Sequence, residues 1–133
     1  MAERNAGERK SKGLSLEEKT SICTEAAIDK KAYNLVVLDL REHSSVTDYF
    51  LICSAGSTRQ VKSIAEAVDE QLGKKKVQPL GVEGLPEARW VLMDYGDLVV
   101  HVFHHETREI YDLERLWGGA PVAFSHKGEQ TEY

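Results

Sequence analysis

The sequence has few of the features that mark secreted, membrane-spanning or metal-binding chains. Only two cysteines occur among its 133 residues, Cys23 and Cys53, and their separation matches no metal-binding or redox motif. We expect both to be small buried side chains in a reducing compartment. No apolar run approaches the length of a membrane span, and the N-terminus lacks the apolar segment of a signal peptide. These absences favour a cytoplasmic protein without membrane contact.

Positive charge is also scarce. Lys and Arg total 17 against 22 Asp and Glu, which gives a formal net charge of -5. Proteins that bind nucleic acid obtain much of their affinity from cations that neutralise phosphates. The charge balance therefore predicts little direct contact with nucleic acid and favours a partner with a basic surface.

The apolar pattern predicts one α/β (or α+β) domain over residues 14–119, with a mixed five-stranded sheet covered by helices. Residues 1–13 and the tail 120–133 are polar and lack periodicity, so we expect both to be disordered or flexible. Strands are expected at Leu35–Leu38, Tyr49–Ser54 and Leu80–Glu83, followed by a hairpin from Trp90 onward.

Helix starts are marked by capping signals. Ser15 and Glu18 form a capping box that predicts a helix to about Lys31, and Ser57 with Gln60 predicts a second helix that stops at Gly73. Thr107 is expected to cap a short last helix that ends at Gly118 and presents the apolar side chains Ile110, Leu113, Leu116 and Trp117.

The stretch WVLMDYGDLVVHVF, residues 90–103, predicts a hairpin that turns at Gly96 and Asp97. Because strand side chains alternate, one hairpin face is fully apolar or aromatic and must be core: Val91, Met93, Tyr95, Leu98, Val100 and Val102. The other face mixes aromatic, acidic and imidazole groups: Trp90, Leu92, Asp94, Val99, His101 and Phe103. This mixture is typical of a protein-binding surface, although a helix of the same chain lying over the face would account for it equally well.

Metal binding and nucleophilic catalysis are two kinds of chemistry that this region could suggest. His101, His104 and His105 match no zinc spacing, and Cys53 has no local histidine with an orienting group that would make it a nucleophile. We therefore expect no metal, cofactor or catalytic residue.

A third kind is phosphate chemistry, which is the alternative function. The turn Ser54–Thr58 could bind phosphate at a helix start, and Asp94 with Asp97 could hold magnesium in a nucleotide-binding or nucleotidyl-transferring enzyme. Paired metal-binding acids on one strand should be two residues apart, whereas Asp97 lies on the turn.

Three motifs in the same order resemble a known family. They read SSVTDYFLICSAGSTRQVKSIAEAV, then PLGVEG, then RWVLMDYGDLVVHVFHHETREIYDLERLW. Together they are similar to the Iojap, or ribosomal silencing factor, family over about Leu16 to Trp117. The N-terminal residues and the tail after Gly119 have no clear counterpart in this resemblance.

The resemblance implies a function without catalysis. Members of the family bind the large ribosomal subunit through its fourteenth protein (uL-fourteen), block joining with the small subunit and thereby repress translation. Related factors act in ribosome biogenesis in organelles. The resemblance also implies a nucleotidyltransferase-like architecture and a homodimer when the protein is free. A basic ribosomal protein is the kind of partner that an acidic chain would favour.

The matched motifs and the hairpin pattern together suggest partner-binding residues. Trp90 is the expected aromatic anchor, with Phe103 beside it on the same hairpin face. Three acids match acidic motif positions and could pair with Lys or Arg of the partner: Asp94, Asp97 and Glu106. His101 and Tyr111 also match positions of the family motif and are candidate partner-binding residues. Asp97 fits a turn former equally well, and His101 and Tyr111 also fit structural roles.

Overall fold

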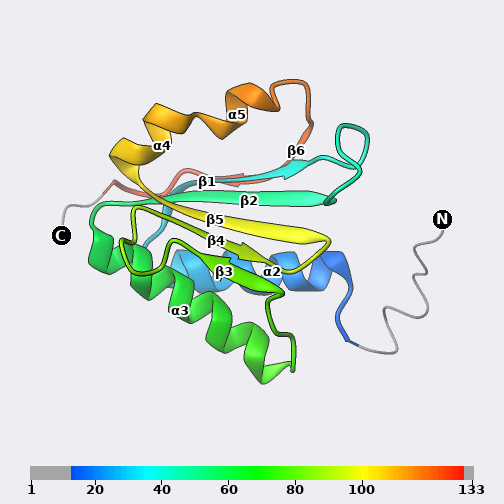
Figure 1. The fold of residues 1–133 in the computed structure, drawn as a ribbon, viewed down its shortest axis with the longest axis horizontal. Helices are drawn as coiled ribbons and strands as arrows, with labels where there is room; N and C mark the ends of the chain where they lie inside the picture. Colours follow the sequence, from blue (N-terminus) through cyan, green and yellow to red (C-terminus); the bar gives the residue numbers. More distant parts are fainter. Residues whose placement is uncertain (1–12, 131–133) are drawn as a thin grey trace.

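One six-stranded mixed sheet runs through the molecule and carries helices on both faces (Figure 1). The computed structural model describes residues 13–130, so the predicted disorder of residues 1–12 lies outside the described residues. The order along the sheet is β3-β4-β5-β2-β1-β6; β2 and β5 are parallel and every other neighbouring pair is antiparallel. The strands are β1 (Tyr33–Asp39), β2 (Tyr49–Ala55), β3 (Gly81–Glu83), β4 (Trp90–Asp94), β5 (Leu98–His104) and β6 (Val122–His126).

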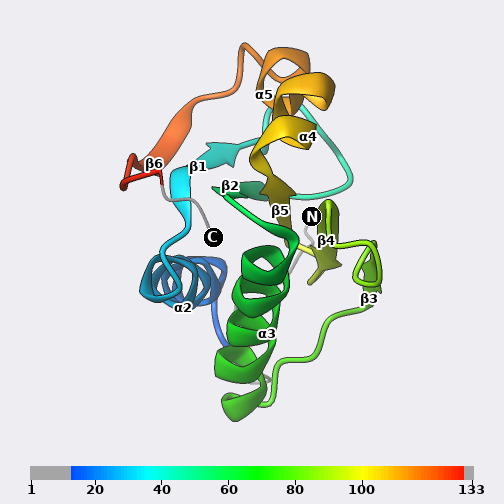
Figure 2. The same cartoon turned by 90° about the vertical axis from the view of Figure 1, so that its left-hand side faces the viewer.

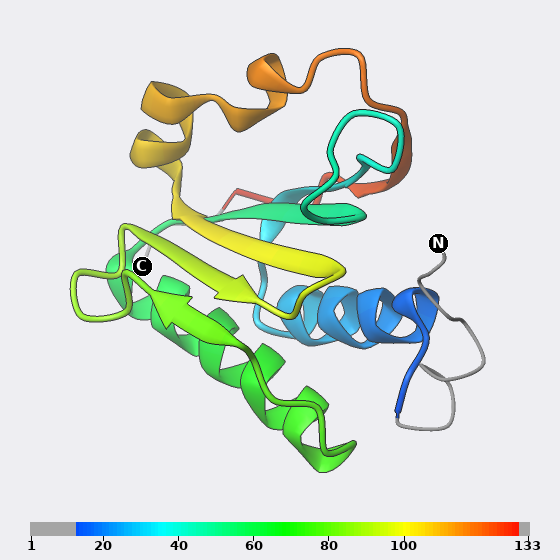
Figure 3. The same ribbon diagram turned by 45° about the vertical axis from the view of Figure 1, so that its right-hand side comes forward.

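The helices divide between the two faces of the sheet. They are α2 (Leu16–Asp29), α3 (Thr58–Lys74), α4 (His105–Tyr111) and α5 (Leu113–Leu116). The long helices α2 and α3 cover one face, and the short helices α4 and α5 lie on the other (Figures 2 and 3). The predicted α/β class is therefore confirmed. Among residues 13–130 no helix is both long and apolar enough to cross a membrane.

Two of the three predicted helix starts, those at Ser15 and Ser57, are confirmed by their hydrogen bonds. The Ser15 hydroxyl accepts from the Glu18 backbone N–H at 3.1 Å, and the Glu18 carboxylate accepts from the Ser15 N–H at 2.9 Å. Ser57 accepts from the Gln60 N–H at 3.1 Å. These bonds satisfy N–H groups that the first turn of a helix leaves unpaired. The predicted stop at Gly73 is wrong by one residue, because α3 includes Gly73 and ends at Lys74.

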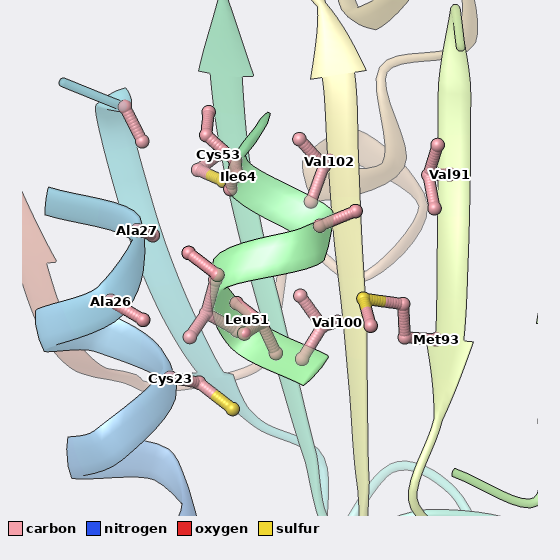
Figure 4. Packing of buried hydrophobic residues seen from close by; sticks show 14 of the residues in the cluster. Cys23, Ala26, Ala27, Leu51, Cys53, Ile64, Val91, Met93, Val100 and Val102 are labelled. Carbon is pink, nitrogen blue, oxygen red and sulfur yellow. The ribbon is translucent and has the colours of Figure 1, made fainter. Parts of the chain in front are cut away.

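The main core lies between the sheet and helices α2 and α3. Figure 4 shows side chains of both helices meeting residues of β2, β4 and β5. Both cysteines belong to this core and are 0% exposed, as expected. Burial raises the pKa of each thiol to about 12, so both stay neutral at physiological pH.

The hairpin has the predicted register. Trp90 pairs with Phe103 and Asp94 with Val99, so the two faces divide as the alternation requires. The six residues predicted for the inner face are all buried in the main core: Val91, Met93, Tyr95, Leu98, Val100 and Val102.

The strand count and the tail prediction need correction. Residues 122–126 form β6, which pairs antiparallel with β1, so the sheet has six strands and this part of the predicted flexible tail 120–133 is a strand. This strand lies at a sheet edge with Val122 and Phe124 still exposed, at 58% and 46%. It therefore lacks the buried alternation by which strands are recognised in sequence.

The predicted last helix is also corrected, because it is two helices. Asp112 adopts a left-handed conformation with φ 47° and ψ 58°, which ends α4 at Tyr111 and lets α5 begin at Leu113. The first helix starts after His104 rather than at Thr107. Of the predicted apolar side chains only Leu113 is buried, while Ile110 and Leu116 are 77% and 73% exposed.

Candidate partner-binding surface

A continuous series of aromatic rings lies on the sheet face that carries α4 and α5. We call this group the aromatic face; it consists of Phe50, Trp90, His101, Phe103, Tyr111 and Trp117. Its members come from β2, β4 and β5, from α4, and from the residue that follows α5, and a smaller apolar cluster around Leu38, Leu40, Ile52 and Leu113 supports it. Strand alternation explains the strand members, because the opposite side chains of the same strands fill the main core.

Trp90 lies at the centre of these contacts. Its ring stacks on Phe103 with centroids 4.9 Å apart and packs against Tyr111 at 4.8 Å. At the other end of the series Phe50 meets His101 edge-on at 4.4 Å and Trp117 at 5.9 Å. Distances of this size are those of interacting aromatic pairs, so the rings fix one another in place.

His101 lies beneath Trp90 and accepts a hydrogen bond from it. The indole N–H of Trp90 donates to Nδ1 of His101 at 3.1 Å. His101 is 3% exposed, and burial lowers its pKa to about 4. The imidazole is therefore neutral at physiological pH, and its remaining proton is on Nε2.

The depressed pKa of His101 predicts how stability depends on pH. An unfolded histidine binds a proton below about pH 6.5, whereas folded His101 does so only below about 4. The contribution of the neutral imidazole is therefore complete above pH 6.5 and is lost as the pH falls towards 4. Between pH 7 and pH 5 this site should lower the unfolding free energy by about 2 kcal/mol.

Urea denaturation at pH 7, 6 and 5 would measure this effect. The His101→Asn variant is the control, because it keeps a polar group without a titrating one. Parallel pH profiles for the two proteins would contradict the assignment of the effect to His101.

Arg108 holds α4 in position over the sheet. Its guanidinium donates to the carbonyl oxygen of Asn34 at 2.5 Å and to the Ser54 hydroxyl at 2.8 Å, and it pairs with Glu114 of α5. These bonds tie α4 to β1, β2 and α5. As a result Tyr111, at the end of α4, lies against Trp90 while remaining 53% exposed.

Exposed apolar and acidic side chains occur on α4 and α5, the helices that flank Asp112. Ile110 and Leu116 are the large apolar residues, and Glu106 and Glu109 are exposed acids of α4. Large apolar side chains exposed on adjoining helices make this region a candidate interaction site.

Four of the predicted partner-binding residues lie together: Trp90, His101, Phe103 and Tyr111. Two of the four do not reach the surface, because His101 is 3% exposed and Phe103 is 0% exposed. Neither side chain can therefore touch a partner directly in this structure. The alternative in which the chain itself covers the outer hairpin face holds for Phe103, whereas Trp90 stays half-buried.

Asp97 is not available as a surface acid either. Its carboxylate lies 2.5 Å from the ammonium of Lys19, and the two side chains are 7% and 10% exposed. Because the partner atom comes from α2, 78 positions away in sequence, the local hairpin pattern carries no sign of this pair. The turn that holds Asp97 is thus fixed to α2.

Asp94 and Glu106, the other two predicted partner-binding acids, differ in their exposure to solvent. Asp94 is half-buried and accepts a hydrogen bond from the Gly96 N–H at 2.8 Å, as a turn-stabilising residue does. Glu106 is exposed in the first turn of α4, the helix that ends at Tyr111. Of these two acids Glu106 is therefore the more accessible.

Phe50 and Trp117 belong to the aromatic face although the sequence pattern did not select them as partner-binding residues. Strand alternation could have identified Phe50. Tyr49, Leu51 and Cys53 face the main core, so the side chain of Phe50 points to the opposite face of the sheet. Its approach to His101 depends on the parallel pairing of β2 with β5. Local sequence does not specify that pairing.

The geometry does not bring together the residues of the nucleotide-binding alternative. Asp97 immediately precedes β5, and its carbonyl accepts a hydrogen bond from the Tyr49 N–H there. Ser54, the first residue of the candidate phosphate-binding turn, instead pairs with Phe103 near the other end of β5. The seven residues of β5 hold these two groups about 20 Å apart. In addition the Gly56 N–H donates to the Gln60 side chain at 2.7 Å, so it is already satisfied. Within residues 13–130 no group of three or more His, Cys, Asp or Glu side chains could hold a metal ion.

Comparison with known proteins gives consistent results. The family described as "Ribosomal silencing factor during starvation" matches residues 14–132, which includes the tail for which the motifs gave no counterpart. The ribosomal silencing factor of Bacillus subtilis is 48% identical over 102 residues, covering 77% of this chain and 86% of that protein. A mouse protein named "Mitochondrial assembly of ribosomal large subunit protein 1" is 31% identical over 91 residues, covering 66% of this chain and 40% of that protein.

A solved structure agrees with the fold as well. A crystal structure of a Chromobacterium violaceum protein superposes with a TM-score of 0.77 at 32% identity, covering 90% of this chain and 92% of that one. The family match spans nearly all of the described residues, including every strand and helix described above and the whole aromatic face. The chain therefore belongs to the ribosomal silencing factor family.

Proposed function

We propose that this protein binds the large ribosomal subunit through the aromatic face and thereby prevents the small subunit from joining. The contact on the ribosome is the fourteenth protein of the large subunit, and the outcome is repression of translation. No bond is made or broken in this mechanism, so we propose a regulatory protein and not an enzyme. The family match and the names of the relatives support the ribosome as the target.

The observation that carries the choice of surface is the exposed centre of the aromatic face. Tyr111 is 53% exposed against a half-buried Trp90, and Ile110 and Leu116 extend the apolar area on both sides of Asp112. Rigid aromatic groups supply large contact area at low entropic cost, which is why they dominate the binding energy of protein interfaces. On this view Trp90 and Tyr111 are the anchors.

Charge supports a basic protein as the partner. The chain has a net charge of -5, and Glu106 and Glu109 are exposed on α4, the helix that ends at Tyr111. Acidic side chains at the rim of an apolar contact favour Lys and Arg on the other surface and disfavour phosphates. We therefore propose a ribosomal protein surface as the main contact, with little direct contact to RNA.

Steric exclusion is sufficient for the mechanism. A folded domain fixed to the joining face of the large subunit occupies space that the small subunit must enter. The binding affinity must then compete with subunit joining. We further propose that the free protein is a cytoplasmic homodimer, which sedimentation equilibrium would test.

Sedimentation of purified ribosomal subunits tests the proposal directly. We expect the protein to migrate with the large subunit alone and to reduce the fraction of joined ribosomes as its concentration rises. Normal subunit joining at saturating protein would contradict the proposed function. The small subunit by itself is the control and should not carry the protein.

Salt should slow association with the large subunit. The attraction between an acidic rim and a basic surface is screened over about 10 Å at 0.1 M ionic strength, and screening lowers the association rate more than it raises the dissociation rate. Association rates measured between about 50 and 300 mM KCl, the range in which screening becomes strong, would show the decrease. The Glu106→Gln, Glu109→Gln double variant should show a weaker salt dependence, and a rate independent of salt would remove the electrostatic argument.

A further inference from the structure

Trp90 is held from beneath by a group that does not itself reach the surface. The indole N–H donates to Nδ1 of His101 at 3.1 Å, which directs this polar edge of the ring into the protein. Phe103 and Tyr111 pack against the ring at 4.9 and 4.8 Å. The part of Trp90 that remains exposed is therefore carbon.

His101 is itself rigidly placed. It lies on β5, opposite Leu92 of β4 and Ile52 of β2, and is 3% exposed. Phe50 meets its ring edge-on at 4.4 Å. A side chain confined by strands on both sides and by a ring contact keeps its rotamer, so its Nδ1 atom is a fixed acceptor.

Keeping an imidazole at this position has a cost. Its Nε2 atom is buried and has no hydrogen-bond partner among residues 13–130. A buried donor without an acceptor is unfavourable, and an apolar side chain of similar size would avoid this penalty. The bond from Trp90 is the specific interaction that an apolar residue in its place could not make.

We propose that His101 is a positioning residue for partner binding: it fixes the orientation of Trp90 so that the partner meets the carbon edge of the indole and not its N–H group. This inference rests on the proposed function and adds the chemistry of the contact. The ribosomal surface that receives Trp90 is apolar or cationic, since a carbonyl or carboxylate acceptor would find no free indole donor there.

Two substitutions of His101 separate positioning from packing. The side-chain oxygen of His101→Asn can occupy the place of Nδ1 and accept the indole N–H, whereas His101→Leu fills the space without an acceptor. We expect His101→Leu to weaken binding to the large subunit about tenfold, the effect of one lost hydrogen bond. His101→Asn should stay close to the wild type in affinity.

The same comparison in a Trp90→Phe background supplies the decisive control. Phenylalanine has no N–H group for His101 to hold, so His101→Leu should cause no further loss of affinity there. If His101 only supports the fold, His101→Leu lowers affinity by the same factor in both backgrounds. All variants are compared at a temperature where urea denaturation shows each of them to be folded.

Hydrogen exchange of the two indole N–H signals gives a readout that does not involve the ribosome. Trp90 should exchange slowly in the wild type and in His101→Asn, and faster in His101→Leu. The indole of Trp117 is the internal reference and should be unchanged.

Each outcome decides a different question. Wild-type protein that fails to sediment with the large subunit overturns the proposed function and this inference with it. Wild-type binding that His101→Leu leaves unchanged, or reduces equally with and without the Trp90→Phe substitution, overturns this inference alone. A tenfold loss confined to the Trp90 background, with recovery in His101→Asn, supports it.

Discussion

Replacing Trp90 with alanine is expected to weaken binding to the large ribosomal subunit by at least about 2 kcal/mol, or roughly 30-fold in affinity. Trp90 is the residue that joins the two halves of the aromatic face, because it contacts Phe103 and His101 on the sheet and Tyr111 on α4. Truncation removes the anchor and also the support under Tyr111. Surface plasmon resonance with immobilised large subunits would measure the change.

The fold should survive this substitution even though stability falls. Trp90 is half-buried, so its removal should cost roughly 2 kcal/mol of unfolding free energy, less than the several kcal/mol that keep a domain of this size folded. Gln71→Ala on α3, on the opposite side of the sheet, is the control for both measurements. An unfolded Trp90→Ala variant would show that the residue is mainly core, and unchanged affinity would remove the aromatic face from the proposed interface.

Replacing Lys19 with methionine is expected to lower the unfolding free energy by about 3 kcal/mol. The Lys19 ammonium lies 2.5 Å from the Asp97 carboxylate, and the two side chains are only 10% and 7% exposed. Methionine keeps the aliphatic length but removes the charge beside a carboxylate that has little access to water. The loss should be visible as a lower urea midpoint with an unchanged slope.

A second ion pair provides the matched control for Lys19→Met. The guanidinium of Arg41 lies 2.6 Å from the carboxylate of Asp39, but these side chains are 49% and 21% exposed. Arg41→Met should therefore lower the unfolding free energy by less than about 1 kcal/mol, the contribution of a surface ion pair. The Lys19→Met, Asp97→Asn double variant should recover part of the stability that Lys19→Met loses. If Asp97 instead serves as a partner-binding acid, Lys19→Met would leave stability unchanged and Asp97→Asn would reduce ribosome binding.

The hairpin is the part of the site that the sequence pattern predicted best. A turn at Gly96 and Asp97 and strict alternation determined which side chains share each face, and the observed pairing of Trp90 with Phe103 follows from these two local features. The helix starts at Ser15 and Ser57 were predictable for the same reason. The atoms of each helix cap lie within a few residues of one another in sequence. The register of the hairpin is set by a turn that is equally local.

Errors arose where a residue's environment is made by distant parts of the chain. The exposed edge strand β6 has no buried alternation, and the left-handed conformation of Asp112 splits the last helix although the apolar spacing continues through it. Phe103 was predicted to be a partner-binding residue, but it is fully buried on the face that α4 and α5 partly cover. Each of these depends on which elements pack together.

The sequence by itself determined the fold class, the two hairpin faces, the helix caps at Ser15 and Ser57 and the family, because periodicity, capping and motifs are local properties of the chain. Only the tertiary structure decided which residues of the mixed face reach the surface. It joined Asp97 to Lys19, placed His101 under Trp90 and brought Tyr111 of α4 against the indole. These contacts link residues from different elements, and their geometry is fixed only when the helices dock on the sheet.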